Sequence, residues 1–260
     1  MPSLKNALID IIKNSGDILL RHYGKLDHIE TKSGSIDLVT AADREAEEYI
    51  IGQIRSHFPE HGILAEESGG DSADSSEFRW VIDPLDGTTN FAHSCPLFCT
   101  SIGVQKGRET ITAAVYNPYY RELFFAEKKA GAFLNQKKIS VSGVDSLGKS
   151  LVTTGFAYDR RERADHYMEI FKDFMMRCHG VRRMGAAALD LCSVACGRCE
   201  GYWEENLKPW DTAAGFLILE EAGGRVTDFS GAPFRIEKKG ILATNGFIHS
   251  DMMDVLSTHF

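Results

Sequence analysis

Two aspartates lie three positions apart after a short apolar run, and their types and spacing suit metal chemistry. The run Trp80–Ile82 is typical of the end of a buried strand, and the Pro and Gly that follow predict a turn around Asp83 and Asp86. An ionised carboxylate leaving a buried strand is costly unless it is paired or coordinates a cation. No basic residue lies between positions 80 and 91, so we expect a metal ion, and oxygen ligands favour a hard one such as Mg²⁺.

The residues that follow Asp86 are small, and Gly87–Asn90 can open a helical turn. The first turn of a helix has backbone N–H groups without intrahelical acceptors, and such a terminus binds phosphate. The sequence thus predicts a phosphate-binding turn directly beside the candidate cation site.

Other carboxylates lie where elements begin or end. Glu66 and Glu67 follow the predicted strand Gly62–Ala65; alone they would be solvated glutamates before a glycine-rich loop, but with two aspartates nearby we expect at least one to be a ligand. Asp211 lies near the start of an apolar helix, where capping would explain it; we favour a metal ligand because a buried helix start can meet strand ends. Asp43 falls in the first turn of another predicted helix, where the helix dipole favours a carboxylate.

The elements that must position these residues follow from periodicity. Residues 3–22 and 41–57 predict two amphipathic helices. Closely spaced strand-like runs then predict an antiparallel meander rather than alternating strands and helices. The runs are Cys99–Val104, Thr110–Tyr116, Glu122–Glu127, Gly131–Asn135 and Lys138–Val141.

The polar stretch Ser142–Ser150 is the best candidate boundary within the chain. We expect an N-terminal α+β subdomain, residues 1–145, with most of the metal ligands, and a C-terminal α/β subdomain, residues 146–260, with Asp211 and the substrate-pocket residues. The second half is predicted to contain strands Leu151–Thr154, Glu200–Trp203, Arg225–Asp228 and Ile241–Thr244, and helices Ala164–Arg177, Gly185–Gly197, Pro209–Ala222 and a terminal one.

The composition is that of a globular protein, with 43% hydrophobic and 25% charged residues. A net charge of −8 argues against a broad nucleic-acid surface, although divalent ions would allow small anions to bind. No apolar run has the length of a membrane span, and the N-terminus lacks the pattern of a signal peptide, so we expect no membrane association and a cytoplasmic location. We expect the six cysteines to be structural thiols.

Three segments together resemble the inositol monophosphatase family of Mg²⁺-dependent, lithium-sensitive phosphatases. The segments are Glu66–Ser68, Asp83–Phe91 and Pro209–Gly215, and the similarity runs from Asp37–Thr40 to Glu220–Gly224. The resemblance implies an α+β fold, namely an alternating α-β-α-β-α layered sandwich of the inositol monophosphatase/fructose bisphosphatase type. It also implies a homodimer.

The resemblance further implies two or three Mg²⁺ ions per active site. The metal ligands would be Glu66, Asp83, the Leu85 carbonyl, Asp86 and Asp211, with Glu66 and water at a third, weaker site. The attacking water would be oriented or deprotonated with the help of Asp43 and Thr88. The substrate-binding residues would be Gly87, Thr88, Gly185, Ala186, Ala187, Glu204 and Asp211, with Lys32 in a loop near the metals.

The implied reaction is hydrolysis of myo-inositol phosphate to myo-inositol and phosphate by a metal-activated water, without a covalent phospho-enzyme. Related groups use the same metal motifs on fructose 1,6-bisphosphate, histidinol phosphate and phosphoadenosine phosphate, so these remain alternative substrates. An interaction role is a further alternative, because some bacterial relatives that resemble this chain, including at Arg182–Arg183 and Gly201–Tyr202, act through RNA polymerase. From position alone, Arg182 and Arg183 are interpreted as structural or interfacial.

Overall fold

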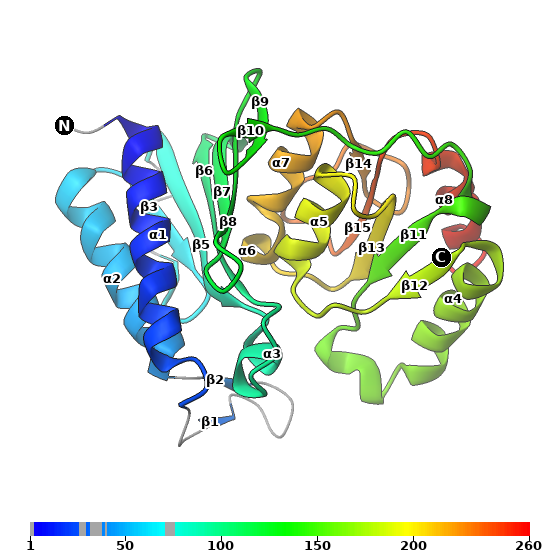
Figure 1. Ribbon diagram of the computed structural model, residues 1–260, viewed down its shortest axis with the longest axis horizontal. Helices are drawn as coiled ribbons and strands as arrows, with labels where there is room; N and C mark the ends of the chain where they lie inside the picture. The colour runs from blue at the N-terminus through cyan, green and yellow to red at the C-terminus, as the bar shows by residue number, and fades with distance from the viewer. Residues whose placement is uncertain (1–2, 26–29, 32–37, 40, 71–75) are drawn as a thin grey trace.

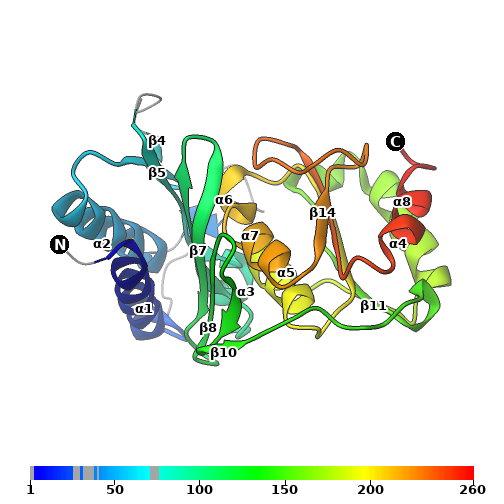
Figure 2. The same ribbon diagram turned by 90° about the horizontal axis from the view of Figure 1, so that it is seen from above.

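The computed structural model describes residues 3–25, 30–31, 38–39, 41–70 and 76–260. The elements form five layers, in which helices alternate with two β-sheets (Figure 1). Seen from above, α1 and α2 form one outer layer, α5 to α7 fill the space between the sheets, and α4 and α8 form the other outer layer (Figure 2). This order confirms the predicted α+β layered sandwich.

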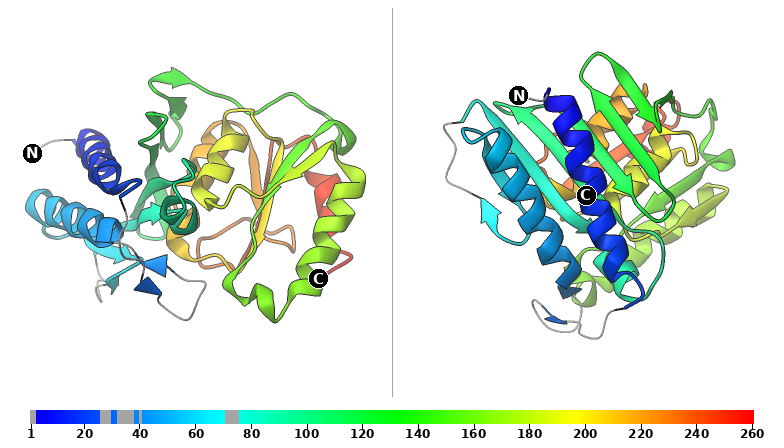
Figure 3. Two further views of the ribbon diagram at one scale, coloured as in Figure 1. Left: turned by 60° about the horizontal axis from the view of Figure 1, so that its bottom comes forward. Right: turned by 60° about the vertical axis from the view of Figure 1, so that its left-hand side comes forward.

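The two N-terminal helices are amphipathic and bury their apolar faces on the first sheet. Helix α1 spans Leu4–His22 and α2 spans Ala41–His57, in agreement with the periodicity. Leu8 of α1 and Ile50 of α2 are fully buried in one apolar cluster with Trp80 of the sheet. Figure 3 shows both helices lying side by side across the strands. This packing fixes the start of α2, and with it Asp43, against the centre of the sheet.

The first sheet has eight strands in the order β10-β9-β8-β7-β6-β5-β3-β4. Its strands β5 to β10 pair antiparallel with their sequence neighbours, which confirms the predicted meander, and β3 runs parallel to β5. The bounds are β3 Gly62–Ala65, β4 Gly69–Gly70, β5 Phe78–Asp86, β6 Cys99–Lys106, β7 Glu109–Asn117, β8 Glu122–Glu127, β9 Gly131–Leu134 and β10 Lys137–Lys138. A separate two-stranded ladder joins β1, Glu30–Thr31, to β2, Leu38–Val39.

The turn predicted around Pro84 is wrong, because β5 continues through Asp86. Asp83 pairs with Ser101 and Asp86 pairs with Cys99, so β5 has one residue more than β6 over this stretch, and the register shifts. Such a bulge tolerates a proline and re-aims the side chains beside it. Two aspartates three positions apart, which a regular strand would point to opposite faces, therefore line the same pocket.

The second sheet has five strands in the order β12-β11-β13-β15-β14. Helix α5 packs on α7 between the sheets, and α4 and α8 cover the far side. The bounds are β11 Leu151–Thr154, β12 Gly180–Arg182, β13 Gly201–Glu205, β14 Arg225–Thr227, β15 Gly240–Thr244, α3 Thr88–Ala92, α4 Ala164–Arg177, α5 Ala187–Ala195, α6 Pro209–Thr212, α7 Gly215–Glu221 and α8 His249–Leu256, with short 3₁₀ turns η1 Leu147–Lys149 and η2 Tyr158–Arg161.

The single helix predicted from Pro209 to Ala222 is also wrong, since it is divided into α6 and α7. The joining residues Ala213 and Ala214 are fully buried, and the carbonyl of Ala213 lies against the backbone of Gly103 in β6. The break lets α6 pack on β5 and β6 while α7 packs on β7 and β8 of the twisted sheet.

The division into subdomains stays a prediction. The link between the two sheets runs through the polar stretch expected there, but α5 to α7 of the second half pack onto strands of the first sheet. None of the helices in the described residues has the length and apolar character needed to cross a bilayer.

Candidate active site

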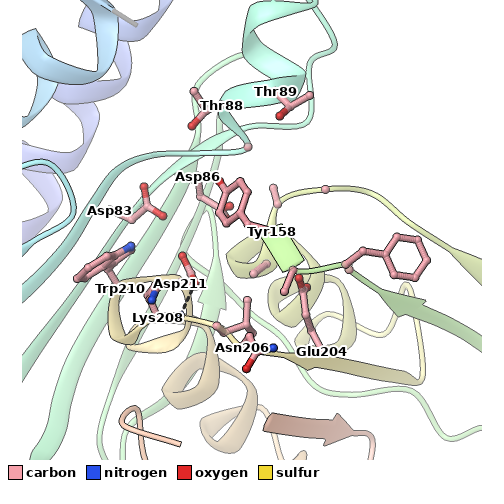
Figure 4. Close-up of a pocket in the computed structure, with 18 of the residues that line it drawn as sticks. Asp83, Asp86, Thr88, Thr89, Tyr158, Glu204, Asn206, Lys208, Trp210 and Asp211 are labelled. Atoms are coloured by element: carbon pink, nitrogen blue, oxygen red, sulfur yellow. Dashed lines mark hydrogen bonds between the residues drawn. The ribbon is translucent and has the colours of Figure 1, made fainter. Parts of the chain in front are cut away.

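A cavity of about 290 Å³ lies where the end of β5, the start of α3, the end of β13 and α6 meet. That volume suits a small metabolite better than a large ligand. Its wall includes the carboxyl groups of Glu66, Asp83, Asp86, Asp211 and Glu204. Figure 4 shows Asp83, Asp86 and Asp211 on one side of this cavity and Glu204 on the other. Residues that are far apart in the sequence are thus brought to one place.

Asp83 and Asp86 are held in place by backbone N–H groups. Asp83 Oδ1 accepts a hydrogen bond from the N–H of Leu85 at 3.0 Å, and Asp86 Oδ2 accepts one from the N–H of Ala188 at 2.8 Å. The second bond joins β5 to the first turn of α5, where the helix dipole favours a negative charge. Each aspartate therefore has a fixed orientation before any cation binds.

The negative charges of the site raise one another's pKa values. Burial raises the pKa of Asp83 well above its usual value, and the carboxylates of Glu66, Asp86, Asp211 and Asp43 raise it further. Burial raises the pKa of Asp86 to about 6, against the lowering effect of the Ala188 N–H. Such a group of carboxylates is stabilised by a bound cation.

Asp211 both caps a helix and lines the cavity. Its Oδ2 accepts a hydrogen bond from the N–H of Lys208 at 2.6 Å, so it caps α6. Burial raises its pKa well above the usual value, and Asp86 and Glu66 raise it further. The side chain therefore caps a helix and also lines the cavity on the same side as Asp83 and Asp86 (Figure 4).

The carboxylates of this pocket wall fit a hard divalent cation, because they supply oxygen atoms and repel one another. Within the described residues, however, no three His, Cys, Asp or Glu side chains already form a group that could hold a metal ion. The assignment of Glu66, Asp83, Leu85, Asp86 and Asp211 as ligands accordingly stays a prediction.

The turn that carries Glu66 is fixed from two sides. The N–H of Glu66 donates to the carbonyl of Ile82 at 3.2 Å, which ties it to β5. The carboxylate of Glu47 in α2 accepts the N–H groups of Glu67 and Ser68 at 2.9 and 2.8 Å. Glu47 is 4% exposed, and sequence reasoning missed it because its helical position shows no sign of the distant turn.

The predicted phosphate-binding turn is the start of α3. Gly87 precedes this helix with φ +89°, and a Cβ at this position would lie 2.7 Å from the carbonyl oxygen of Leu97, so only glycine fits. The Thr88 hydroxyl donates to the Leu85 carbonyl at 3.1 Å and faces the cavity. Asp43 is fully buried in the first turn of α2, as expected, and it does not line the cavity itself.

The opposite wall comes from the second half of the chain. Gly185, Ala186 and Ala187 line the cavity as predicted, and Asn90 ties them to α3 by donating to the carbonyl of Met184 at 2.8 Å. Burial raises the pKa of Glu204 to about 7. The predicted polyol contact therefore lies opposite the predicted metal ligands. Lys32 lies outside the described residues.

Several lining residues were not identified from the sequence. Arg183, interpreted as structural or interfacial, lines the cavity, whereas Arg182 ends the edge strand β12 and is exposed. Tyr158 and Arg160 reach the cavity from η2 (Figure 4 labels Tyr158). No local pattern marks η2, because its contact with the cavity depends on how β11 is placed beside β13.

One of the cysteines contacts the site: the Cys99 thiol donates to Asp86 Oδ2 at 3.7 Å and lowers the pKa of that carboxyl. All six lie in described parts of the chain and are free thiols. Burial raises the pKa of Cys99 and Cys192 well above the usual value, so both stay protonated and pack as small apolar groups.

Comparison with known proteins places this geometry in a family. The model of the inositol monophosphatase family matches residues 2–259. The chain is 48% identical to an inositol-1-monophosphatase of Synechocystis sp. over 235 residues, covering 90% of this chain and 82% of that protein. It is 40% identical to a putative Nus factor SuhB of Neisseria meningitidis serogroup B over 255 residues, covering 98% of both.

Solved structures of inositol monophosphatases and of a suhB protein have the same fold as this chain. An inositol monophosphatase from Anabaena (Nostoc) sp. superposes with a TM-score of 0.88 at 44% identity, covering 97% of this chain and 94% of that one. The extragenic suppressor protein suhB from Bartonella henselae superposes with a TM-score of 0.94 at 36% identity over the whole of both chains. The chain belongs to the inositol monophosphatase family, a family of phosphoric monoester hydrolases.

Proposed function

We propose that this protein is a Mg²⁺-dependent inositol-1-monophosphatase that hydrolyses myo-inositol phosphate to myo-inositol and phosphate. The observation that carries the proposal is the single cavity that joins a carboxylate group, the first turn of a helix and a second carboxylate wall. The names of its relatives, which include inositol-1-monophosphatase, support the same substrate.

Glu66, Asp83, the Leu85 carbonyl, Asp86 and Asp211 would hold two or three Mg²⁺ ions. When bound there, the ions supply Lewis acidity and offset the repulsion that raises the pKa of Asp83. The bonds from Leu85 and Ala188 N–H groups keep Asp83 and Asp86 oriented, so little reorganisation accompanies binding.

The chain's own groups orient the phosphate and the water. The N–H groups of Gly87 and Thr88 would bind phosphate oxygens, because both residues line the cavity and N–H groups at the start of a helix have no intrahelical acceptors. The Thr88 hydroxyl faces the cavity and would orient the attacking water, and the buried carboxylate of Asp43, which does not line the cavity, would help deprotonate that water indirectly. Glu66, in the turn after β3, would assist in activating the water.

The far wall selects the alcohol portion of the substrate. Gly185–Ala187 leave room for a ring, and Glu204 accepts a hydrogen bond from a ring hydroxyl when it is ionised. Arg183 beside it lowers the pKa of Glu204 and so favours that form. A polyol phosphate thus meets complementary groups at both ends.

A substrate panel tests the proposal. Release of inorganic phosphate is measured for myo-inositol 1-phosphate, fructose 1,6-bisphosphate, histidinol phosphate and phosphoadenosine phosphate, with Mg²⁺ and with EDTA. We expect fastest turnover of the inositol phosphate, abolished by EDTA and by Asp83→Asn. Negligible turnover of it beside a fast alternative would refute the substrate assignment, and activity in EDTA would refute the metal assignment.

Some relatives are named Nus factor SuhB. Together with the family resemblance at Arg182–Arg183, these names lead us to propose a second role, contact with the transcription machinery through RNA polymerase. Arg182 is exposed at the sheet edge and does not line the cavity, so it separates this role from catalysis. We expect purified RNA polymerase to bind the wild type and Asp83→Asn equally and Arg182→Ala more weakly. No binding by the wild type would refute this role.

We also propose that the protein is a homodimer, as the family resemblance implies. Light scattering coupled to size exclusion should give twice the chain mass of 28.9 kDa, and a monomer mass at micromolar concentration would refute it. A cytoplasmic location stays a prediction.

A further inference from the structure

The carboxylate of Glu204 is held by a residue on its own strand. Tyr202 and Glu204 are two positions apart in β13, so both side chains point to the same face of the sheet. The Tyr202 hydroxyl donates to Glu204 Oε2 at 2.6 Å. Tyr202 is fully buried in the main apolar core, and burial raises its pKa well above the usual value, so it remains a proton donor.

The other side of Glu204 is bounded by Gly155, which follows β11. A Cβ at Gly155 would lie 2.0 Å from Glu204 Oε2 and 2.2 Å from Cδ and Oε1. These three are the nearest atoms to that point, so the clash would fall on the end of one flexible side chain and not on backbone. The carboxylate therefore rests directly on the backbone of Gly155, between this glycine and Tyr202.

The groups around Glu204 have opposing effects on its pKa. Burial, with a smaller contribution from Asp86, raises the pKa of Glu204 to about 7, although the Tyr202 bond and Arg183 lower it. Buried Asp190 in α5 also faces Glu204, and burial raises the pKa of Asp190 well above its usual value. The Tyr202 bond thus favours the ionised, hydrogen-bond-accepting form near neutral pH.

We propose that Tyr202 and Gly155 are positioning residues that fix the Glu204 carboxylate as the acceptor for a substrate hydroxyl and thereby set the selectivity for polyol phosphates over simple phosphomonoesters. This inference rests on the function proposed above. Neither residue touches the substrate in this scheme. Tyr202 orients the Glu204 carboxylate, and the absence of a Cβ at Gly155 leaves the space that this carboxylate occupies.

The test uses the full-length enzyme with Mg²⁺ and two substrates, myo-inositol 1-phosphate and p-nitrophenyl phosphate, which has no ring hydroxyls. Selectivity is the ratio of their kcat/KM values. Tyr202→Phe and Gly155→Ala should each lower this selectivity about tenfold, through a higher KM for the inositol phosphate. A tenfold change is the size expected when the hydrogen bond between the ionised Glu204 and the substrate hydroxyl is lost. Tyr116→Phe and Gly52→Ala, whose sites lie on β7 and α2, are matched controls that should leave the selectivity unchanged.

A double-mutant cycle separates positioning from general damage. In a Glu204→Ala background the two substitutions have no carboxylate left to move, so each should change selectivity less than twofold. Undiminished effects in that background, or unchanged selectivity in both single variants, would overturn the inference. Hydrolysis of neither substrate by the wild type would instead overturn the proposed function.

Discussion

The carboxylate of Glu47 should control both stability and metal binding, although it lies outside the cavity. Its two oxygens accept the N–H groups of Glu67 and Ser68, immediately after the predicted ligand Glu66. Glu47→Gln keeps the length of the side chain and replaces one acceptor oxygen by an NH₂ group. That group faces a backbone N–H, so one bond is lost and one donor is left unpaired.

The magnitude follows from the burial of this contact. A hydrogen bond to a charged group contributes about 1.5–3 kcal/mol, and an unsatisfied buried donor costs about 1–3 kcal/mol. Glu47 is 4% exposed, but the turn at Glu67 is only half-buried and Ser68 is exposed, so water can reach part of it. We therefore expect a loss of about 2 kcal/mol in the free energy of unfolding.

Urea denaturation in EDTA measures this loss without any contribution from bound metal. The same titration with added Mg²⁺ should show a smaller stabilisation for Glu47→Gln, because the turn no longer holds Glu66 in one orientation. The Mg²⁺ concentration for half-maximal phosphatase activity should rise about tenfold, which corresponds to about 1.4 kcal/mol. Glu48→Gln, at the neighbouring exposed position of α2, is the matched control and should change neither quantity.

Two results would refute the reasoning. An unfolding free energy for Glu47→Gln within about 0.5 kcal/mol of the wild type would show that the two bonds contribute little. A loss of stability with an unchanged Mg²⁺ dependence would show that the turn does not position Glu66.

Three further outcomes are expected. Burial raises the pKa of Asp190 well above its usual value, so the stability that this carboxyl contributes is complete below about pH 4 and is lost as the pH rises through the raised pKa. Relative to the wild type, Asp190→Asn should therefore be more stable at pH 8 than at pH 5 in urea titrations. An equal difference in stability at pH 5 and at pH 8 would contradict this. Gly87→Ala should lose about 1–3 kcal/mol of stability, measured in the same way, because φ is +89° and Leu97 leaves no room; wild-type stability would contradict it. Lithium at millimolar concentration should inhibit phosphate release, and insensitivity would argue against the predicted metal ligands.

The local elements were largely predictable because each has its own hydrophobic pattern. Helices α1 and α2 and strands β3 and β8 have the predicted bounds to within one residue, since apolar spacing and flanking Gly or Pro mark their ends. That Asp83 and Asp86 belong to one site was also predictable, because they lie three positions apart without a basic residue between them, and both line the same pocket.

Contacts between distant segments were not predictable in the same way. Glu47 is one acidic residue among several in α2, and only the packing of that helix on the sheet brings it to the turn after β3. Gly155 is one of 24 glycines, and its importance follows only from where Glu204 folds. Both cases depend on side chains from separate elements meeting at one point.

The sequence by itself determined the types of residue available for catalysis: carboxylates that need a cation and a small-residue turn suited to phosphate. Only the family resemblance implied Glu204 as the contact for a substrate hydroxyl. Tertiary structure decided how these residues face one another. The bulge in β5 turns Asp83 and Asp86 to one pocket, and the break between α6 and α7 sets Asp211 against β5. Composition and spacing describe single segments, whereas a site requires the relative placement of several, and that placement is fixed by packing between the layers.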